Sequence, residues 1–179
     1  LEGLQVTCRK RRKRASHLRL IPAAPSRANQ RWSLDFVSDA LSDGRRYRAL
    51  TVIDQLTREC LAIEAAGTLP SAAVTAALDR IILQRGKPDS LTVDNGSEFT
   101  SRHFDAWAYQ NEIKVDFITP GRPMENGLIE SFNGKLRDEC LNTHWFADII
   151  EARFTLESWR LTYNDERPHS SLNDLTPTE

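Results

Sequence analysis

Two kinds of apolar pattern follow one another along this chain, and their order narrows the choice of fold. Alternation with a period of two indicates a strand, whereas recurrence at every third and fourth position indicates a helix. Strand patterns come first, in three consecutive segments, at 32–37, 47–53 and 59–65. Helical and strand patterns then alternate before two final helical segments, at 70–85, 91–94, 101–111, 113–118, 126–141 and 147–163. This order predicts an α/β fold, a mixed five-stranded sheet flanked by helices.

The first strand pattern separates an apolar face from a mixed face. Trp32, Leu34 and Phe36 fall on one face, and Asp35 falls on the other. A Ser-Asp-Gly turn signal at 42–44 follows. We expect the second and third strands to be antiparallel neighbours.

Local signals also mark the ends and buried faces of the helices. Pro70 is expected to open one helix and Gly86 to end it. Its inner face is predicted to consist of Val74, Leu78, Ile81 and Ile82. The last helix is expected to bury Phe154 and Leu161.

The helical segment 126–141 carries two parallel stripes of different character. The apolar stripe consists of Ile129, Phe132, Leu136 and Cys140. The polar stripe, rotated by about 100° around the helix axis, consists of Asn126, Glu130, Asn133 and Arg137. Because the apolar stripe is expected to face the core, the segment holds a carboxylate directly beside the core.

Three carboxylates occupy unusual positions. Asp35 lies in the middle of a strand, Asp94 at the end of an apolar strand, and Glu130 beside the apolar stripe of a helix. Aspartate is disfavoured inside strands, and an unpaired buried carboxylate is costly. Binding of Mg²⁺, which prefers carboxylate oxygens, would resolve both problems. Two such ions about 4 Å apart can activate the attacking oxygen of a phosphodiester reaction and stabilise the leaving oxygen.

Each of these carboxylates also has an ordinary explanation. Asp94 precedes Asn-Gly, where an aspartate often only forms a turn. Glu130 alone resembles a surface residue of a helix, and Asp54, at another strand end, competes with Asp35. The residues by themselves therefore leave both explanations open.

Charge is distributed unevenly along the chain. The first 31 residues hold nine basic residues and one acidic residue, whereas the remainder holds 15 basic and 24 acidic residues. Six basic residues are consecutive: Arg9, Lys10, Arg11, Arg12, Lys13 and Arg14. Such a run either binds a polyanion or only keeps the chain soluble. Pro22, Pro25 and the polar residues after them predict a linker, so we place the start of the folded domain near residue 31.

Composition argues against several other classes of protein. No apolar run approaches the roughly 20 residues that a membrane span requires, and no secretory signal is apparent. Cys8, Cys60 and Cys140 form no CxxC pair, which argues against a zinc ribbon and a disulfide framework. The remaining side chains show no Ser/His/Asp or Cys/His arrangement. Residues expected to be structural are His103, His144 and His169, as satisfied histidines, and Trp107, Trp145 and Trp159, as core or interface anchors.

Three blocks and a C-terminal segment resemble one family of enzymes. These segments are Trp32–Phe36, Thr92–Phe99, Pro120–Arg137 and Tyr163–Leu172. Asp94 and Glu130 enclose 35 residues, and Arg137 follows the glutamate by seven positions. In this combination the chain resembles the DDE integrase-core transposases of bacterial insertion sequences, from the large family that uses two overlapping reading frames. That family is related to the catalytic cores of retroviral integrases.

The resemblance implies a ribonuclease H-like fold in which Asp35, Asp94 and Glu130 are catalytic and bind two Mg²⁺ or Mn²⁺ ions. It implies phosphodiester hydrolysis at transposon ends and DNA strand transfer by the resulting 3′-hydroxyl. Double-stranded DNA and further copies of the chain are the implied partners, with no membrane, in the bacterial cytoplasm at the nucleoid. Residues 1–30 would be a basic arm at the end of an N-terminal DNA-binding region. Residues 31–179 would be the catalytic core with a C-terminal helical tail.

Contacts with DNA are expected from the helix at 126–141 and from the basic run. Arg137 lies about 10 Å along the helix axis from Glu130, where it would hold a phosphate near the metal ions. The other DNA-binding candidates are Lys135, Asn126, Asn133, Arg9, Lys10, Arg11, Arg12, Lys13 and Arg14.

Two other functions remain open. The first is a ribonuclease H-like nuclease or junction resolvase, which often takes a further acid from the first helix. Asp79 is the only carboxylate in that predicted helix. The second is an inactive DNA-binding relic, against which all three acids and Arg137 are present.

Overall fold

A single mixed sheet forms the centre of the computed structural model, which describes residues 24–119 and 126–179. Its strands are β1 (Arg31–Ala40), β2 (Arg46–Asp54), β3 (Cys60–Ala66), β4 (Ser90–Val93) and β5 (Lys114–Phe117). They lie in the order β3-β2-β1-β4-β5. β1, β2 and β3 are antiparallel neighbours, whereas β4 and β5 continue the sheet parallel to β1. The predicted mixed five-stranded sheet is confirmed.

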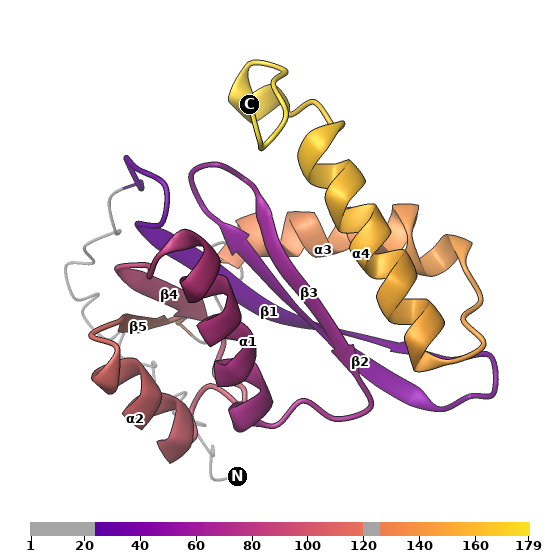
Figure 1. Ribbon diagram of the computed structural model, residues 1–179, viewed down its shortest axis with the longest axis horizontal. Helices are drawn as coiled ribbons and strands as arrows, with labels where there is room; N and C mark the ends of the chain where they lie inside the picture. The colour runs from indigo at the N-terminus through magenta and orange to yellow at the C-terminus, as the bar shows by residue number, and fades with distance from the viewer. Residues whose placement is uncertain (1–23, 120–125) are drawn as a thin grey trace, which may run out of the picture.

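Two pairs of helices cover the sheet. The helices are α1 (Ser71–Arg85), α2 (Arg102–Gln110), α3 (Gly127–Glu139) and α4 (Ile149–Asp165), with short 3-10 turns at Leu141–Thr143 and Ser170–Leu172. Figure 1 shows α1 and α2 grouped on one side of the twisted sheet and α3 and α4 on the other, with α4 running beside β3. Gly86 caps the end of α1, as predicted.

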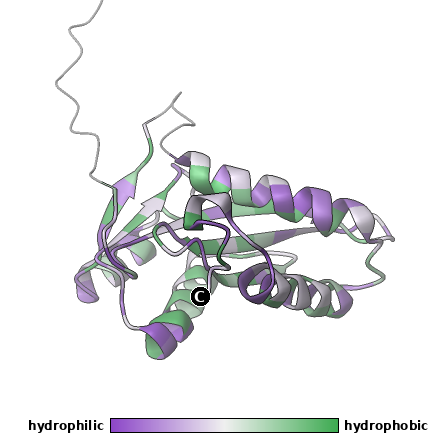
Figure 2. Ribbon diagram, turned by 90° about the horizontal axis from the view of Figure 1, so that it is seen from above, coloured by the Kyte–Doolittle hydropathy of each residue, from purple (hydrophilic) through white to green (hydrophobic). Residues whose placement is uncertain are grey.

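The alternation in β1 supplies a hydrophobic core to each face of the sheet. Trp32 and Leu34 are fully buried in the core beneath α1 and α2, whereas Val37 is buried beneath α3 and α4. The predicted apolar stripe of α3 is buried, because Ile129, Phe132, Leu136 and Cys140 are at most 2% exposed. In Figure 2, hydrophobic and hydrophilic residues both occur along each helix, as a two-sided arrangement requires.

The prediction for the buried face of α4 is wrong. Phe154 is 79% exposed and Leu161 is 47% exposed. The face that packs against the sheet instead consists of Ala152, Leu156 and Tyr163. Asn164, near the end of the same helix, donates to the backbone oxygen of Cys60 (2.9 Å) and accepts from its backbone nitrogen (2.8 Å). These two bonds fix the end of α4 against the start of β3.

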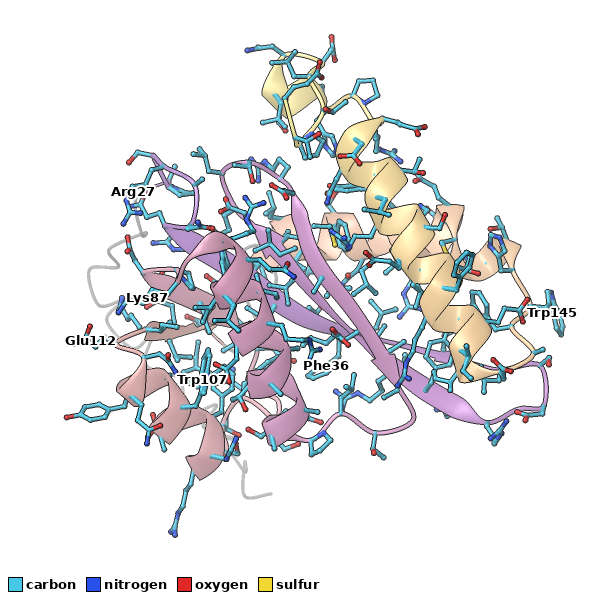
Figure 3. All side chains as sticks on the ribbon, viewed as in Figure 1. Arg27, Phe36, Lys87, Trp107, Glu112 and Trp145 are labelled. Atoms are coloured by element: carbon cyan, nitrogen blue, oxygen red, sulfur yellow. The ribbon has the colours of Figure 1, made fainter. Side chains whose placement is uncertain are left out.

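The tryptophans and histidines divide between core and surface. Trp107 is buried and Trp159 packs on the core, but Trp145 is 86% exposed and projects away from the body in Figure 3. His103 and His144 have hydrogen-bonding partners, as expected. His169 departs from the expectation, because its Nε2 is buried and has no hydrogen-bond partner among the described residues.

Some predictions lie outside the described residues. These include the start of the Pro120–Arg137 block that resembles the transposase family and most of the arm expected at residues 1–30. The domain boundary near residue 31 therefore remains a prediction. Within the two described stretches, every helix is too short or too polar to cross a membrane.

Candidate active site

Asp35 and Asp94 are brought together by the pairing of β1 with β4. The two strands are parallel, and their register places Ser33 opposite Thr92. Asp35 and Asp94 each follow these paired residues by two positions, so they occupy equivalent places on neighbouring strands. Thr51 on β2 lies opposite Asp35 on its other side. The centre of the sheet thus presents two carboxylates side by side.

Two hydrogen bonds orient the half-buried carboxylate of Asp35. Its Oδ1 accepts from the backbone nitrogen of Phe36 (2.7 Å), and its Oδ2 accepts from Nδ2 of Asn133 on α3 (2.9 Å). Oδ1 of Asn133 accepts in turn from the hydroxyl of Thr51 (3.0 Å). Asn133 and Thr51 are both buried. This chain of hydrogen bonds joins β1, β2 and α3 at the position of the carboxylate.

The backbone that follows β4 holds Asp94. Oδ1 of Asp94 accepts from the backbone nitrogen of Gly96 (2.9 Å). A side chain at position 96 would meet this oxygen, because a Cβ built on Gly96 lies 2.9 Å from it. The side chain of Asn95 donates to the backbone oxygen of Ile118, which anchors the same turn. The Asn-Gly pair therefore shapes the turn that positions Asp94.

The third predicted carboxylate, Glu130, lies on α3, and its side chain is exposed. The pKa of Asp35 is raised above its ordinary value, first by burial and then by the negative charges of Asp94 and Glu130. The hydrogen bonds from Phe36 and Asn133 oppose this shift in pKa. The other two carboxylates predicted from sequence, Asp94 and Glu130, are therefore close enough to affect the ionisation of Asp35.

This arrangement of strands and helices is that of a known family. Residues 25–123 match a family model described as the integrase core domain, and residues 111–177 match a second model with the same description. The chain belongs to the integrase core domain family.

Relatives in this family come from bacterial insertion elements. The chain is 47% identical over 177 residues to the insertion element IS407 uncharacterized 31.7 kDa protein of Burkholderia multivorans, covering 99% of this chain and 64% of that protein. It is 26% identical over 156 residues to the putative transposase InsK for insertion sequence element IS150 of Escherichia coli, covering 86% and 55% respectively. The chain thus spans between about half and two thirds of these relatives' lengths.

A solved integrase core has the same fold. The HTLV-2 integrase catalytic core domain in complex with magnesium (trimeric form) aligns with a TM-score of 0.64 and 19% sequence identity, covering 84% of this chain and 94% of that one. The ribonuclease H-like fold expected from the sequence is therefore confirmed.

The integrase core presents oxygen donors of the kind that a hard divalent cation prefers. Burial raises the pKa of Asp35, the negative charges of Asp94 and Glu130 raise it further, and a bound cation would relieve this repulsion. In the described stretches, however, no three His, Cys, Asp or Glu side chains stand close enough together to hold a metal ion. The residues fit such a cation in chemistry and in charge, although the three carboxylates stand farther apart than three ligands of one ion.

Two other acids that the sequence placed in competition have structural partners. The carboxylate of Asp54 is fully buried and accepts from the backbone nitrogens of Asn29, Leu56 and Thr57. Oδ1 of Asp79 accepts from Nε1 of Trp107 (2.8 Å), which joins α1 to α2. Each carboxylate is therefore engaged in holding the fold.

No local pattern in the sequence indicates a role for Thr51 or for an ion pair beside the site. Arg48 on β2 pairs with Glu98 and stacks over the ring of Phe36, with its Cζ 4.0 Å from the ring centroid. Burial favours a higher pKa for Glu98, but the hydrogen bond from Arg48 and other donors hold that pKa below its usual value. Only the β1–β2 pairing, which sequence periodicity does not specify, brings Thr51 and Arg48 to this position.

The proposed DNA-contact residues are spread over several faces of α3. Arg137 is exposed and lies near β1, with its Nη1 3.4 Å from the backbone oxygen of Ser38. Asn133 faces Asp35 instead of solvent. Asn126 is buried at the start of α3, and Lys135 lines a cavity on another side of the helix. The remaining candidates lie outside the described residues: Arg9, Lys10, Arg11, Arg12, Lys13 and Arg14.

Proposed function

We propose that this integrase core is the catalytic part of a DDE transposase, which cleaves phosphodiester bonds at transposon ends and transfers the 3′-hydroxyl strand to target DNA. The observation that carries the proposal is the convergence of β1, the end of β4 and α3 on the carboxylate of Asp35. The relatives named for insertion elements support the same reaction.

Each residue in the site has a distinct part in this proposal. Asp35, Asp94 and Glu130 would hold two Mg²⁺ or Mn²⁺ ions through their carboxylate oxygens. When bound, such ions activate the attacking oxygen and stabilise the leaving oxygen of a phosphodiester. Asn133 orients the Asp35 carboxylate through its hydrogen bond, and Thr51 orients Asn133. Arg137, exposed two helical turns after Glu130, would hold a phosphate of the DNA backbone.

The proposed partners are double-stranded DNA and further copies of the chain. Two transposon ends must be held together for transfer, so a homo-oligomer on DNA is expected. The HTLV-2 integrase core, which has a similar fold, is a trimeric form in complex with magnesium. This is consistent with a homo-oligomer and with a bound divalent cation. A bacterial cytoplasmic location at the nucleoid follows from the same reaction.

A ribonuclease H-like nuclease is the second candidate function, and Asp79 bears on it. Such a nuclease often takes a further acid from its first helix, and the carboxylate of Asp79 on α1 already accepts a hydrogen bond from Trp107. Replacing Asp79 with Asn should therefore leave the activity of a transposase core within about twofold, because the Asn oxygen can still accept from the indole.

A branched DNA that mimics a strand-transfer product tests the proposed reaction. We expect the chain with Mn²⁺ to resolve the branch, and Glu130→Gln to lower the rate at least about a hundredfold. Asp138→Asn is the matched control, because Asp138 is an exposed acid on the same helix.

Equal activity of the wild type and Glu130→Gln would contradict the assignment of Glu130. No activity from folded wild type would instead favour the inactive DNA-binding relic. Circular dichroism of each variant verifies that the compared proteins are folded.

A further inference from the structure

A cavity with polar and apolar walls lies on the other side of α3 from the carboxylates. It has a volume of about 210 Å³ and is bounded by α3, the end of α4, the β2–β3 turn and the C-terminal segment. Its polar lining consists of Arg58, Ser131, Lys135, Tyr163, His169 and Ser171. Lys135 follows Glu130 by five residues, which corresponds to a rotation of about 140° around the helix axis. The cavity is therefore separate from the candidate active site.

Two cations in this cavity have no ion-pair partner. Within the described stretches, the side chains of Arg58 and Lys135 form no ion pair or hydrogen bond, and the negative charges of Asp54 and Glu139 act on them only at longer range. The nearby acid, Glu139, is already paired with Arg167. Burial lowers the pKa of Lys135, and the positive charges of Arg167 and Arg58 lower this pKa further. Two cations whose side chains have no ion-pair partner in the described stretches thus line the cavity.

His169 adds a buried polar atom without a partner. Its side chain belongs to a residue that is only 6% exposed, and its Nε2 finds no hydrogen-bond partner in the described part of the chain. Its ring packs edge-on against Tyr163, with 4.9 Å between centroids, and its backbone nitrogen donates to Leu175 (2.9 Å). The imidazole is held rigidly while its Nε2 remains unused. Such an atom costs free energy unless a ligand satisfies it.

We infer that this cavity binds a phosphate group. A phosphate would neutralise Arg58 and Lys135 and accept a hydrogen bond from Nε2 of His169 in its Nε2-protonated form. The hydroxyls of Ser131 and Ser171 line the same cavity and supply further donors. The volume far exceeds the roughly 30 Å³ share of one water molecule, so a tetrahedral anion can enter. A carboxylate, with two oxygens, would leave more of these converging donors unsatisfied.

Binding of inorganic phosphate to the whole chain, without divalent cations, tests this inference. We expect phosphate to shift the imidazole NMR signals of His169 in a saturable way, at an ionic strength held constant with chloride. Lys135→Met should weaken phosphate binding at least about tenfold while keeping the apolar stem in place. Lys87→Met is the matched control, because Lys87 pairs with Glu112 on α2's side of the molecule.

His169→Phe provides a second variant that keeps the ring contact with Tyr163 and removes Nε2. We expect it to lose phosphate binding as well. Unsaturable shifts, or equal affinity in wild type and Lys135→Met, would overturn the inference. Should His169→Phe fail to fold, Lys135→Met still decides the outcome, because Lys135 lies on a partly exposed helix face.

A short single-stranded oligonucleotide distinguishes the two sources of phosphate. Tighter binding of the oligonucleotide than of inorganic phosphate, lost in Lys135→Met, would identify a DNA backbone phosphate as the ligand. Equal affinity would identify the free anion. Asp94→Asn should leave phosphate binding unchanged, so a failure of the proposed catalytic function would not affect this result.

Discussion

At the scale of single residues, the ionisation of Asp35 reports on the whole carboxylate group. Its pKa is raised by burial and by Asp94 and Glu130, so ionising Asp35 costs folding free energy. This cost is absent below its ordinary pKa of 3.8 and grows as the pH rises through the raised value. Asp94→Asn removes one negative charge and keeps an oxygen for the backbone nitrogen of Gly96. We expect the pKa of Asp35 to fall in this variant, as measured by carboxyl-carbon NMR titration.

A second variant is the control for this titration. Asp105→Asn removes an exposed acid from α2 and should leave the pKa of Asp35 unchanged. Addition of Mg²⁺ to the wild type should also lower this pKa, because a cation favours the ionised carboxylate. An unchanged pKa of Asp35 in Asp94→Asn would mean that the two carboxylates do not interact.

Asn133 should act on the same pKa in the opposite direction. Its hydrogen bond stabilises the ionised form of Asp35, so Asn133→Ala raises the pKa of Asp35 and moves the acidic limb of the activity profile to higher pH. The variant also removes one of the two acceptors of the Thr51 hydroxyl, which can still donate to the backbone oxygen of Asp35 (3.2 Å), so we expect a cost of about 0.5–1.5 kcal/mol in urea unfolding. Asn142→Ala, at an exposed position, is the control for both measurements. A loss of stability without a shift of the pH profile would reduce Asn133 to a structural role.

Sequence predicted the three acids but not the residues that orient them. Asp35, Asp94 and Glu130 stand out because carboxylates are unfavourable where they occur. Thr51 is an ordinary strand residue, and its contact with Asn133 depends on the register of β1 with β2. Register is a long-range property, so no local pattern in the chain indicates this contact.

At the scale of elements, the turn after β4 orients the carboxylate of Asp94. Gly96→Ala places a Cβ 2.9 Å from Oδ1 of Asp94, so the carboxylate must move. We expect at least about a tenfold loss in strand-transfer rate, with a change in unfolding free energy below about 1 kcal/mol. Gly67→Ala is the matched control, because nothing lies within 4 Å of a Cβ there. Equal rates for the two variants would show that the turn does not position Asp94.

For α4, the helical period of apolar residues predicted the wrong buried face. Its buried stripe, Ala152, Leu156 and Tyr163, has the same internal spacing as its exposed stripe, Ile150, Phe154 and Leu161. A helical period cannot choose between two apolar faces with identical spacing. The small side chain of Ala152 and the paired hydrogen bonds of Asn164 with Cys60 select the face that packs on the sheet. The strands and the other helices had one apolar pattern each, and their predictions were confirmed.

At the scale of the whole molecule, positive and negative charges are unevenly distributed along the chain. The body after residue 31 carries more acidic than basic residues, although DNA is a polyanion. Many of its exposed basic side chains are already paired with acids, including Arg45 with Asp43 and Arg80 with Glu64. The six consecutive basic residues at 9–14 are the densest run of positive charge in the sequence, so we expect them to supply most of the electrostatic affinity for DNA.

Replacing all six residues at 9–14 with Gln tests this division between arm and body. Each phosphate that a basic residue neutralises contributes about −0.9 to the slope of log binding constant against log salt concentration, so full engagement of six residues contributes about −5. We expect the variant to bind non-specific duplex DNA at least about tenfold more weakly, with a correspondingly shallower slope. Neutralising Arg45, Arg80 and Lys87, which are paired in the folded body, should change the slope little. An unchanged slope in the arm variant would place the electrostatic contacts on the body, and Arg137 and Lys135 would then be the first residues to replace.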